Sequence, residues 1–310
     1  MLALGVCFDT VDWRWWVRED KLAKILSLLQ KVTNGEKMTK DSIQSINGRI
    51  IDLSFLVRGG RYNMVHLLRA AMQLEHDPKP LTPSNLLREQ CEWRSIRLQA
   101  SFFSSPITNP DLTRTATALQ AWTDAAGGCD KAFGAGVGGV IPPFVYFYQP
   151  WPAWLNNHRK NSSGDVFSSK LSCLELLGPL ITISVIPEMV VEQHLVVYVD
   201  NQGSCDIYRK GYSTKCLYAA CIAKACFDVA EGLGATMSVE KIRRCSDWGS
   251  LAADTLSKGK MAEFREMMPG RDKIPATIPQ TIIDWLKDPT QDWKLGSKIV
   301  LEIKKENECI

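Results

Sequence analysis

The chain has 310 residues, of which 45% are hydrophobic and 23% are charged, and its 37 Lys and Arg residues exceed its 34 Asp and Glu residues to give a net charge of +3. This length accommodates two domains with cores of their own, and the composition is that of an ordinary globular protein, which excludes a disordered chain. The small positive excess permits a polyanionic partner without requiring one.

The first third of the chain predicts a β-hairpin followed by a small helical bundle. Apolar and aromatic residues on both sides of the Asp9–Asp12 turn indicate a hairpin over Leu2–Val17, the end of a larger sheet. Helical spacing of apolar residues between glycine and proline breaks then predicts four helices, at Glu19–Val32, Lys40–Val57, Tyr62–Leu74 and about Ser84–Phe103. Basic residues are distributed over this bundle: Arg58, Arg61, Arg69, Arg88, Arg94 and Arg97. We expect this domain to span residues 1–104 and a proline-containing linker to span 105–117.

Residues 118–260 alternate strand and helix signals, which predicts an α/β domain with a mixed five-stranded sheet flanked by helices. The expected strands are Leu119–Asp124, Gly134–Ile141, Phe144–Tyr148, Leu195–Val199 and Thr236–Ile242. The expected helices run from Ser168 or Ser169 to about Val185 with a bend at Pro179, then over Lys215–Ala230 and Trp248–Lys258. A turn containing Gly203 and Gly211 is expected after Asp200. The tail, 261–310, predicts short amphipathic pieces at Gln280–Lys287 and Leu295–Ile303.

Cysteine and hydropathy patterns favour an intracellular protein. The ten cysteines and four histidines form no C-x-x-C pair and no cluster at zinc spacing, so we expect reduced thiols. The longest apolar run, Leu171–Val191, is interrupted by Glu175, Pro179 and Glu188, and no signal-peptide pattern is present, so no membrane association is expected. The cytoplasm is the expected location, with the nucleus as the alternative.

Four acidic residues occupy positions that suggest a metal site. Asp124 ends the first strand of the α/β domain, Asp200 ends its buried central strand, Glu175 lies in an apolar helix face, and Asp254 lies in the last helix beside small and apolar residues. Each acid alone has an ordinary explanation as a turn residue or an exposed helix residue. Together, carboxylates in such apolar settings repel one another unless a cation is present. Oxygen ligands suit Mg²⁺, and two such ions can act on a phosphodiester.

The motifs around these acids, TDAAGG, LELL, VVYVDNQG and AADTLSKG, together resemble the ribonuclease H domain of reverse-transcribing retroelements, most closely the DIRS-like and gypsy-like kinds. The resemblance covers about Leu119–Lys258. Earlier in the chain, LALGVCFDT, KLAKILSLL and SIQSINGRIIDLSFLVRGGR resemble the last palm strands and the thumb or connection region of such reverse transcriptases. The tail resembles a segment found downstream of that ribonuclease H in some elements.

The resemblance implies hydrolysis of the RNA strand of an RNA–DNA hybrid with two Mg²⁺ ions, for which Mn²⁺ can substitute. In this interpretation Asp124 bridges both metals, Asp200 and Asp254 complete one of them, and Glu175 binds the other and orients the ribose 2′-OH. Contacts to nucleic acid are expected from Arg209 and Lys210 on phosphates, and from Asn201 and Gln202 in the minor groove. For Arg209 and Lys210, a solvated turn is an equal alternative.

Two departures from the family pattern leave other functions open. No Tyr-x-Asp-Asp motif occurs, so polymerase activity is not expected, and a separate palm and fingers portion is a candidate partner. The loop Arg243–Gly249 has no histidine, whereas some ribonucleases H place a product-release histidine there. The alternatives are a catalytically inactive retroelement remnant that binds nucleic acid or protein, and a transposase or integrase core. Glu175 argues against the latter, because such cores usually have no acid on the first helix.

Overall fold

The computed structural model divides the chain into two compact units, Met1–Thr113 and Arg114–Ile310, which we describe separately. It describes residues 2–3, 6–9, 14–53, 57, 60–101, 105–106, 118–126, 135–143, 145–152, 174–213, 216–268, 274–287 and 294–308. The division between the units falls within the segment 105–117 that the sequence indicated as a linker. None of the described helices combines the length and apolar character needed to cross a lipid bilayer.

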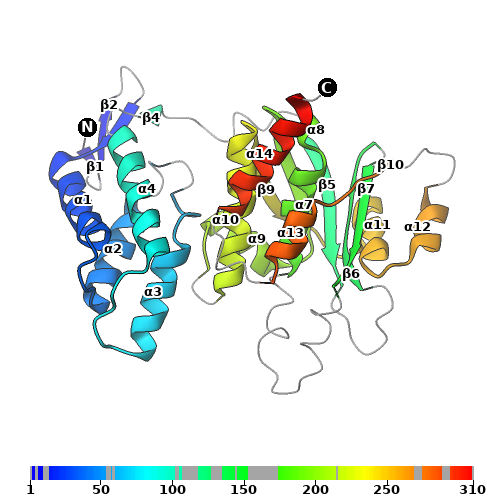
Figure 1. Ribbon diagram of the computed structural model, residues 1–310. Helices are drawn as coiled ribbons and strands as arrows, with labels where there is room; N and C mark the ends of the chain where they lie inside the picture. Colours follow the sequence, from blue (N-terminus) through cyan, green and yellow to red (C-terminus); the bar gives the residue numbers. More distant parts are fainter. Residues whose placement is uncertain are drawn as a thin grey trace. The chain divides into compact units, whose positions relative to one another are not determined.

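Unit 1 contains a small antiparallel sheet and four helices (Figure 1). The sheet has the order β1-β2-β3-β4, and β2 pairs with β3 as the expected hairpin. Its strands are β1 (Leu2–Ala3), β2 (Val6–Asp9), β3 (Arg14–Val17) and β4 (Ser105–Pro106). Its helices are α1 (Glu19–Thr33), α2 (Lys40–Leu53), α3 (Val65–His76) and α4 (Asn85–Ser101). Each of the four helices therefore overlaps a helix that the apolar spacing predicted.

Three details of unit 1 differ from the predictions. The segment expected as a linker begins with β4, which pairs with β3. Helix α3 begins at Val65 instead of Tyr62, because residues 60–64 form turns whose carbonyl groups at Gly60 and Asn63 accept hydrogen bonds from Arg94 Nη2 at 2.5 and 2.7 Å. Arg94 is therefore a buried structural residue, 1% exposed, and not part of a basic surface. Val57, expected to end the second helix, lies in a bend after α2, and residues 54–56 lie outside the described residues.

Unit 2 is an α/β domain built on a mixed sheet of the order β10-β7-β6-β5-β8-β9. Strand β6 is antiparallel to both of its neighbours, β5 and β7, whereas β5, β8 and β9 run parallel. The strands are β5 (Leu119–Ala125), β6 (Gly136–Ile141), β7 (Val145–Pro150), β8 (His194–Val199), β9 (Thr236–Lys241) and β10 (Ile274–Pro275). The mixed α/β sheet is confirmed, but it has six strands instead of five, because β10 from the tail pairs with β7.

Helices cover both faces of this sheet (Figure 1). Helix α11 packs against β5, β6 and β7 on one face, and α7 packs against β5 and β6 on the other, with α10 beside α7 and α14 against α10. The helices are α7 (Leu177–Val185), α8 (Pro187–Val190), α9 (Gln202–Lys210), α10 (Leu217–Gly232), α11 (Trp248–Ser257), α12 (Met261–Met267), α13 (Gln280–Trp285) and α14 (Leu295–Glu308). The tail is thus part of unit 2, since β10 extends its sheet and α14 packs on its helix α10.

The turn expected after Asp200 is instead a helix, α9. Asn201 is its N-cap and accepts a hydrogen bond from the backbone N–H of Ser204 at 3.2 Å, and Gly211 ends it in a left-handed conformation with φ of 79°. Of the two glycines that suggested a turn, Gly203 lies in the first turn of this short helix and Gly211 ends it. The helix starts predicted at Ser168 or Ser169 and at Lys215 lie outside the described residues.

Close backbone approach at Gly138 sets the distance between the sheet and α11. Gly138 pairs with Asp124 across β5 and β6, and a Cβ at this position would lie 2.6 Å from both Leu256 Cβ and the backbone nitrogen of Ser257. On the opposite face, Gly178 of α7 packs in the same way against Thr123. Because successive residues of a strand point to opposite faces, Thr123 lies under α7 and Asp124 lies under α11.

We expect Gly138→Ala to lower the free energy of unfolding of unit 2 by about 2 kcal/mol, because the added methyl group overlaps the backbone of α11. Chemical denaturation followed by circular dichroism measures this change. Gly48→Ala is the control: Gly48 lies in α2, no atom lies within 4 Å of the added Cβ, and helix propensity predicts a gain of about 0.5–1 kcal/mol for unit 1. Unchanged stability of Gly138→Ala would mean that α11 can shift away from the sheet.

Candidate active site

Three aspartates from separate elements meet at the carboxyl ends of β5 and β8, two inner strands of the unit 2 sheet. Strands β5 and β8 are parallel neighbours with Trp122 opposite Tyr198, so Asp124 near the end of β5 and Asp200 directly after β8, each two residues further on, lie side by side. Asp254 comes from α11, which packs against β5. The side chains of Asp124 and Asp254 are only 7% and 10% exposed, and that of Asp200 is 22% exposed. This proximity agrees with the positions predicted for the three acids.

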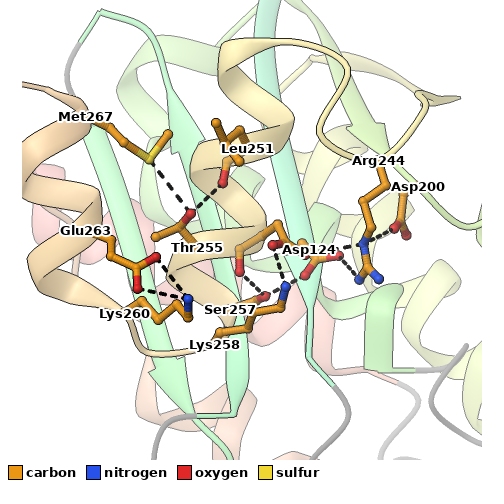
Figure 2. Close-up of polar contacts among 11 residues, drawn as sticks. Asp124, Asp200, Arg244, Leu251, Thr255, Ser257, Lys258, Lys260, Glu263 and Met267 are labelled. Carbon is orange, nitrogen blue, oxygen red and sulfur yellow. Dashed lines mark hydrogen bonds and ion pairs between the residues drawn. The ribbon is translucent and has the colours of Figure 1, made fainter.

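Arg244 pairs with all three aspartates. Its Nε lies 3.0 Å from Asp200 Oδ2 and 3.3 Å from Asp254 Oδ1, and its Nη2 lies 3.6 Å from Asp124 Oδ1. Figure 2 shows the guanidinium group between Asp200 and Asp124. The surrounding carboxylates raise the pKa of Arg244 against the opposing effect of burial, so the group remains a cation.

Glu175 lies just before α7, close enough to interact with two of the aspartates. Burial, followed by repulsion from Asp200 and Asp124, raises its pKa from 4.5 to about 8, and a hydrogen bond with the Asn201 side chain opposes this shift. Its Oε2 is buried and accepts no hydrogen bond from the described residues. Its position follows from Pro179, which has no N–H to bond the carbonyl of residue 175, so that α7 begins at Leu177. The predicted helix is accordingly interrupted at Leu176, ahead of the proline.

Asp124 and Asp254 are each held at one carboxylate oxygen. Ser257 Oγ donates to Asp124 Oδ2 at 2.5 Å, and Lys258 Nζ lies 2.6 Å from Asp254 Oδ2. The other oxygen of each carboxylate faces Arg244. Burial raises the pKa of Asp124, and the nearby Asp200 and Asp254 add to that shift, whereas Ser257 and Arg244 lower it. Each buried aspartate thus has one anchored oxygen and one oxygen directed into a shared space.

The donor set suits a hard divalent cation, although the side chains are not arranged around one. Among the described residues, no three Asp, Glu, His or Cys side chains are grouped closely enough to hold a metal as they stand. However, Glu175 Oε2 and Asp254 Oδ1 are buried and accept no hydrogen bond from the described residues. A cationic group already lies between the aspartates, and all of the candidate ligands are carboxylate oxygens, which Mg²⁺ prefers. Asp124, Glu175, Asp200 and Asp254 are therefore the residues that could hold a metal.

The four residues predicted to contact nucleic acid lie on or beside α9. Asn201 caps the helix and hydrogen-bonds Glu175, so its side chain supports the site. Gln202 Nε2 donates to Asp206 Oδ1 at 3.0 Å in the first turn. Arg209 and Lys210 are at the other end of α9, about 10 Å further along the helix axis than Gln202. Arg209 is 71% exposed and lies 3.5 Å from Asp206 Oδ1, so the structure does not bring it to the acids.

Sequence reasoning did not identify Arg244, Ser257 or Lys258 as site residues. Ser257 and Lys258 follow Asp254 at helical spacing of three and four residues, a signal that could have placed them beside it. Arg244 lies in a loop, where spacing carries no information about which side chain points inward.

Comparisons with known proteins leave the family open: no protein-family model matches the chain, and no curated protein matches it. Inference about function depends on the geometry of the site and on the short motifs around the four acids.

Proposed function

We propose that unit 2 is a metal-dependent nuclease that hydrolyses the RNA strand of RNA–DNA hybrids, as the ribonuclease H domains of retroelements do. The observation that carries this proposal is the meeting of four acids from four separate segments at one edge of the sheet, two of them with one oxygen anchored and the other directed inward. A mixed sheet with helices on both faces supports it, because ribonuclease H domains are built on such a sheet.

The chain's own residues would supply binding and orientation. Ser257 fixes the rotamer of Asp124 and Lys258 that of Asp254, so both inward oxygens are positioned before any ligand arrives. Two Mg²⁺ ions held by Asp124, Glu175, Asp200 and Asp254 would supply a water of lowered pKa and neutralise the leaving 3′-oxygen. Glu175 would accept a hydrogen bond from the ribose 2′-OH, the group that distinguishes RNA from DNA.

A cleavage assay with the full chain tests the proposal. We expect Mg²⁺-dependent cleavage of a labelled RNA strand in an RNA–DNA hybrid, with the DNA strand, duplex DNA and duplex RNA left intact. Asp200→Asn should lower the rate at least about 100-fold, because the site loses one of its charged oxygen ligands. Asp284→Asn is the matched control, since Asp284 is an exposed acid on α13 that pairs with the nearby Lys287 at 3.4 Å. An intact hybrid after incubation with folded protein and either Mg²⁺ or Mn²⁺ would overturn the proposal.

One observation favours a second function, a nucleic-acid-binding module without catalysis. Arg244 and Lys258 together place two cations beside the aspartates, so the charge of the site is partly neutralised by the chain itself. In this case the protein should shift the fluorescence anisotropy of a labelled hybrid with similar affinity in the wild type and in Asp200→Asn, and neither should cleave it. The two functions are therefore separated by the same pair of proteins.

A further inference from the structure

The loop that carries Arg244 is constrained at Cys245 and at Asp247. It connects β9 to α11, and Cys245, directly after Arg244, has a left-handed backbone with φ of 50°, which is unfavourable for a residue other than glycine. Asp247 then closes the loop with a capping box to Ser250 and accepts a hydrogen bond from Trp122 Nε1 at 3.1 Å. The strained backbone and the anchored cap together direct the Arg244 side chain over the acids.

The contacts of Arg244 are typical of a loosely held cation. Its single Nε–H faces both Asp200 Oδ2 at 3.0 Å and Asp254 Oδ1 at 3.3 Å, so it can donate fully to only one of them. Two of the three contacts share Nε, so the nitrogens of Arg244 are divided among three carboxylates. The side chain is also 57% exposed, so it can rotate into solvent without any change in the core.

We propose that Arg244 is a positioning residue that serves as an internal counter-ion: it keeps the aspartates together while no metal is bound and leaves the space between them when divalent cations bind. This inference rests on the proposed function, because it assumes that the acids are metal ligands. A guanidinium group and a divalent cation cannot share the inward oxygens of Asp124 and Asp254. Lys258, which pairs with the other oxygen of Asp254, can remain in place.

Competition between Arg244 and the metal has two measurable consequences. Without metal, Arg244→Ala should destabilise unit 2, because three carboxylates lose their shared cation. With metal, the same variant should bind more tightly, because no side chain has to be displaced first. A residue that only stabilised the fold would lower the melting temperature without increasing metal affinity.

Titration with MgCl₂ and MnCl₂ alone, without nucleic acid, tests this by calorimetry and by thermal unfolding of the full chain. We expect the Kd for Mg²⁺ to fall about tenfold in Arg244→Ala and the metal-free Tm to fall by about 2–4 °C, with the Tm difference disappearing at saturating Mg²⁺. Arg244→Lys retains the positive charge and should fall between the two proteins, and it replaces the alanine variant if the latter does not fold. Arg243→Ala is the matched control, because Arg243 is the exposed neighbour in the same loop.

The possible outcomes separate this inference from the proposed function. If the wild type binds Mg²⁺ and Arg244→Ala binds it equally or more weakly, the counter-ion role is wrong and the metal site stands. If the wild type binds Mg²⁺ more weakly than Arg244→Ala but cleaves no hybrid, Arg244 has the proposed role and the nuclease function is wrong. If neither protein binds Mg²⁺ or Mn²⁺, both proposals are overturned.

Discussion

Replacing Asp124 with asparagine should abolish hybrid cleavage and, at the same time, make the metal-free protein more stable. Asp124 is the most central of the four acids: it pairs with Arg244, bonds to Ser257, and is repelled by Asp200 and Asp254. Asparagine has the same shape and can still accept the hydrogen bond from Ser257, but it lacks the negative charge that binds a metal. We therefore expect a loss of activity of at least about 1000-fold.

The gain in stability follows from the direction of the pKa shift. Burial raises the pKa of Asp124 above 3.8, so the folded state holds its proton at pH values where the unfolded chain has released it. The carboxylate consequently destabilises the fold as pH rises through the folded-state pKa. Removing it should raise the free energy of unfolding by about 1 kcal/mol at pH 7. Such an exchange of stability for function is common at active sites.

Urea unfolding at pH 7, beside the cleavage assay, measures both effects on one preparation. Asp284→Asn, which removes an exposed acid from α13, should change neither. If Asp124→Asn retains cleavage, Asp124 is not part of the active site. If it is less stable than the wild type, the attraction between Asp124 and Arg244 outweighs the repulsion among the acids.

Stability of the metal-free wild type should decrease from pH 5 to pH 9, and Glu175→Gln should remove much of that decrease. The folded-state pKa of Glu175 is about 8 and its ordinary value is 4.5. Between these values the folded protein retains a proton that the unfolded chain has lost, so raising the pH favours unfolding. Because Glu175 is only partly buried, we expect an effect of about 2 kcal/mol at pH 9, smaller than the full shift would give.

Urea titrations at pH 5, 7 and 9 measure this difference, with Glu188→Gln as the control for removing an exposed acid from a neighbouring helix. Saturating Mg²⁺ should flatten the wild-type profile, since a metal favours the ionised form of Glu175. Parallel pH profiles for the wild type and Glu175→Gln would show that the pKa of Glu175 is not raised in the folded protein.

Much of the site could be predicted because its aspartates belong to elements with strong local signals. The apolar runs before Asp124 and Asp200 predict buried strands, and parallel neighbours place their carboxyl ends at a common edge. Asp254 follows from the apolar pattern of its helix, which packs over Gly138. The side-chain contacts among these acids could not be predicted, because they depend on distances between elements that are far apart in the sequence.

Arg244 and α9 are two features that local sequence patterns do not predict. Arg244 reaches the site through a left-handed backbone at Cys245, and no local pattern predicts such a conformation at a cysteine. At α9, Gly203 and Gly211 suggest a turn, but Gly203 lies in the first turn of the helix and Gly211 ends it in a left-handed conformation. Glycine occurs both in turns and at helix ends, so its presence does not distinguish the two.

The pairing of β10 with β7 has a consequence for how the sheet avoids aggregation. An uncovered edge strand presents unpaired N–H and C=O groups that can recruit a strand from another molecule. On this edge the last strand is only two residues long and ends at Pro275, which has no N–H to offer an incoming strand. The tail thereby protects unit 2 from edge-to-edge association at the side of the sheet away from the acids.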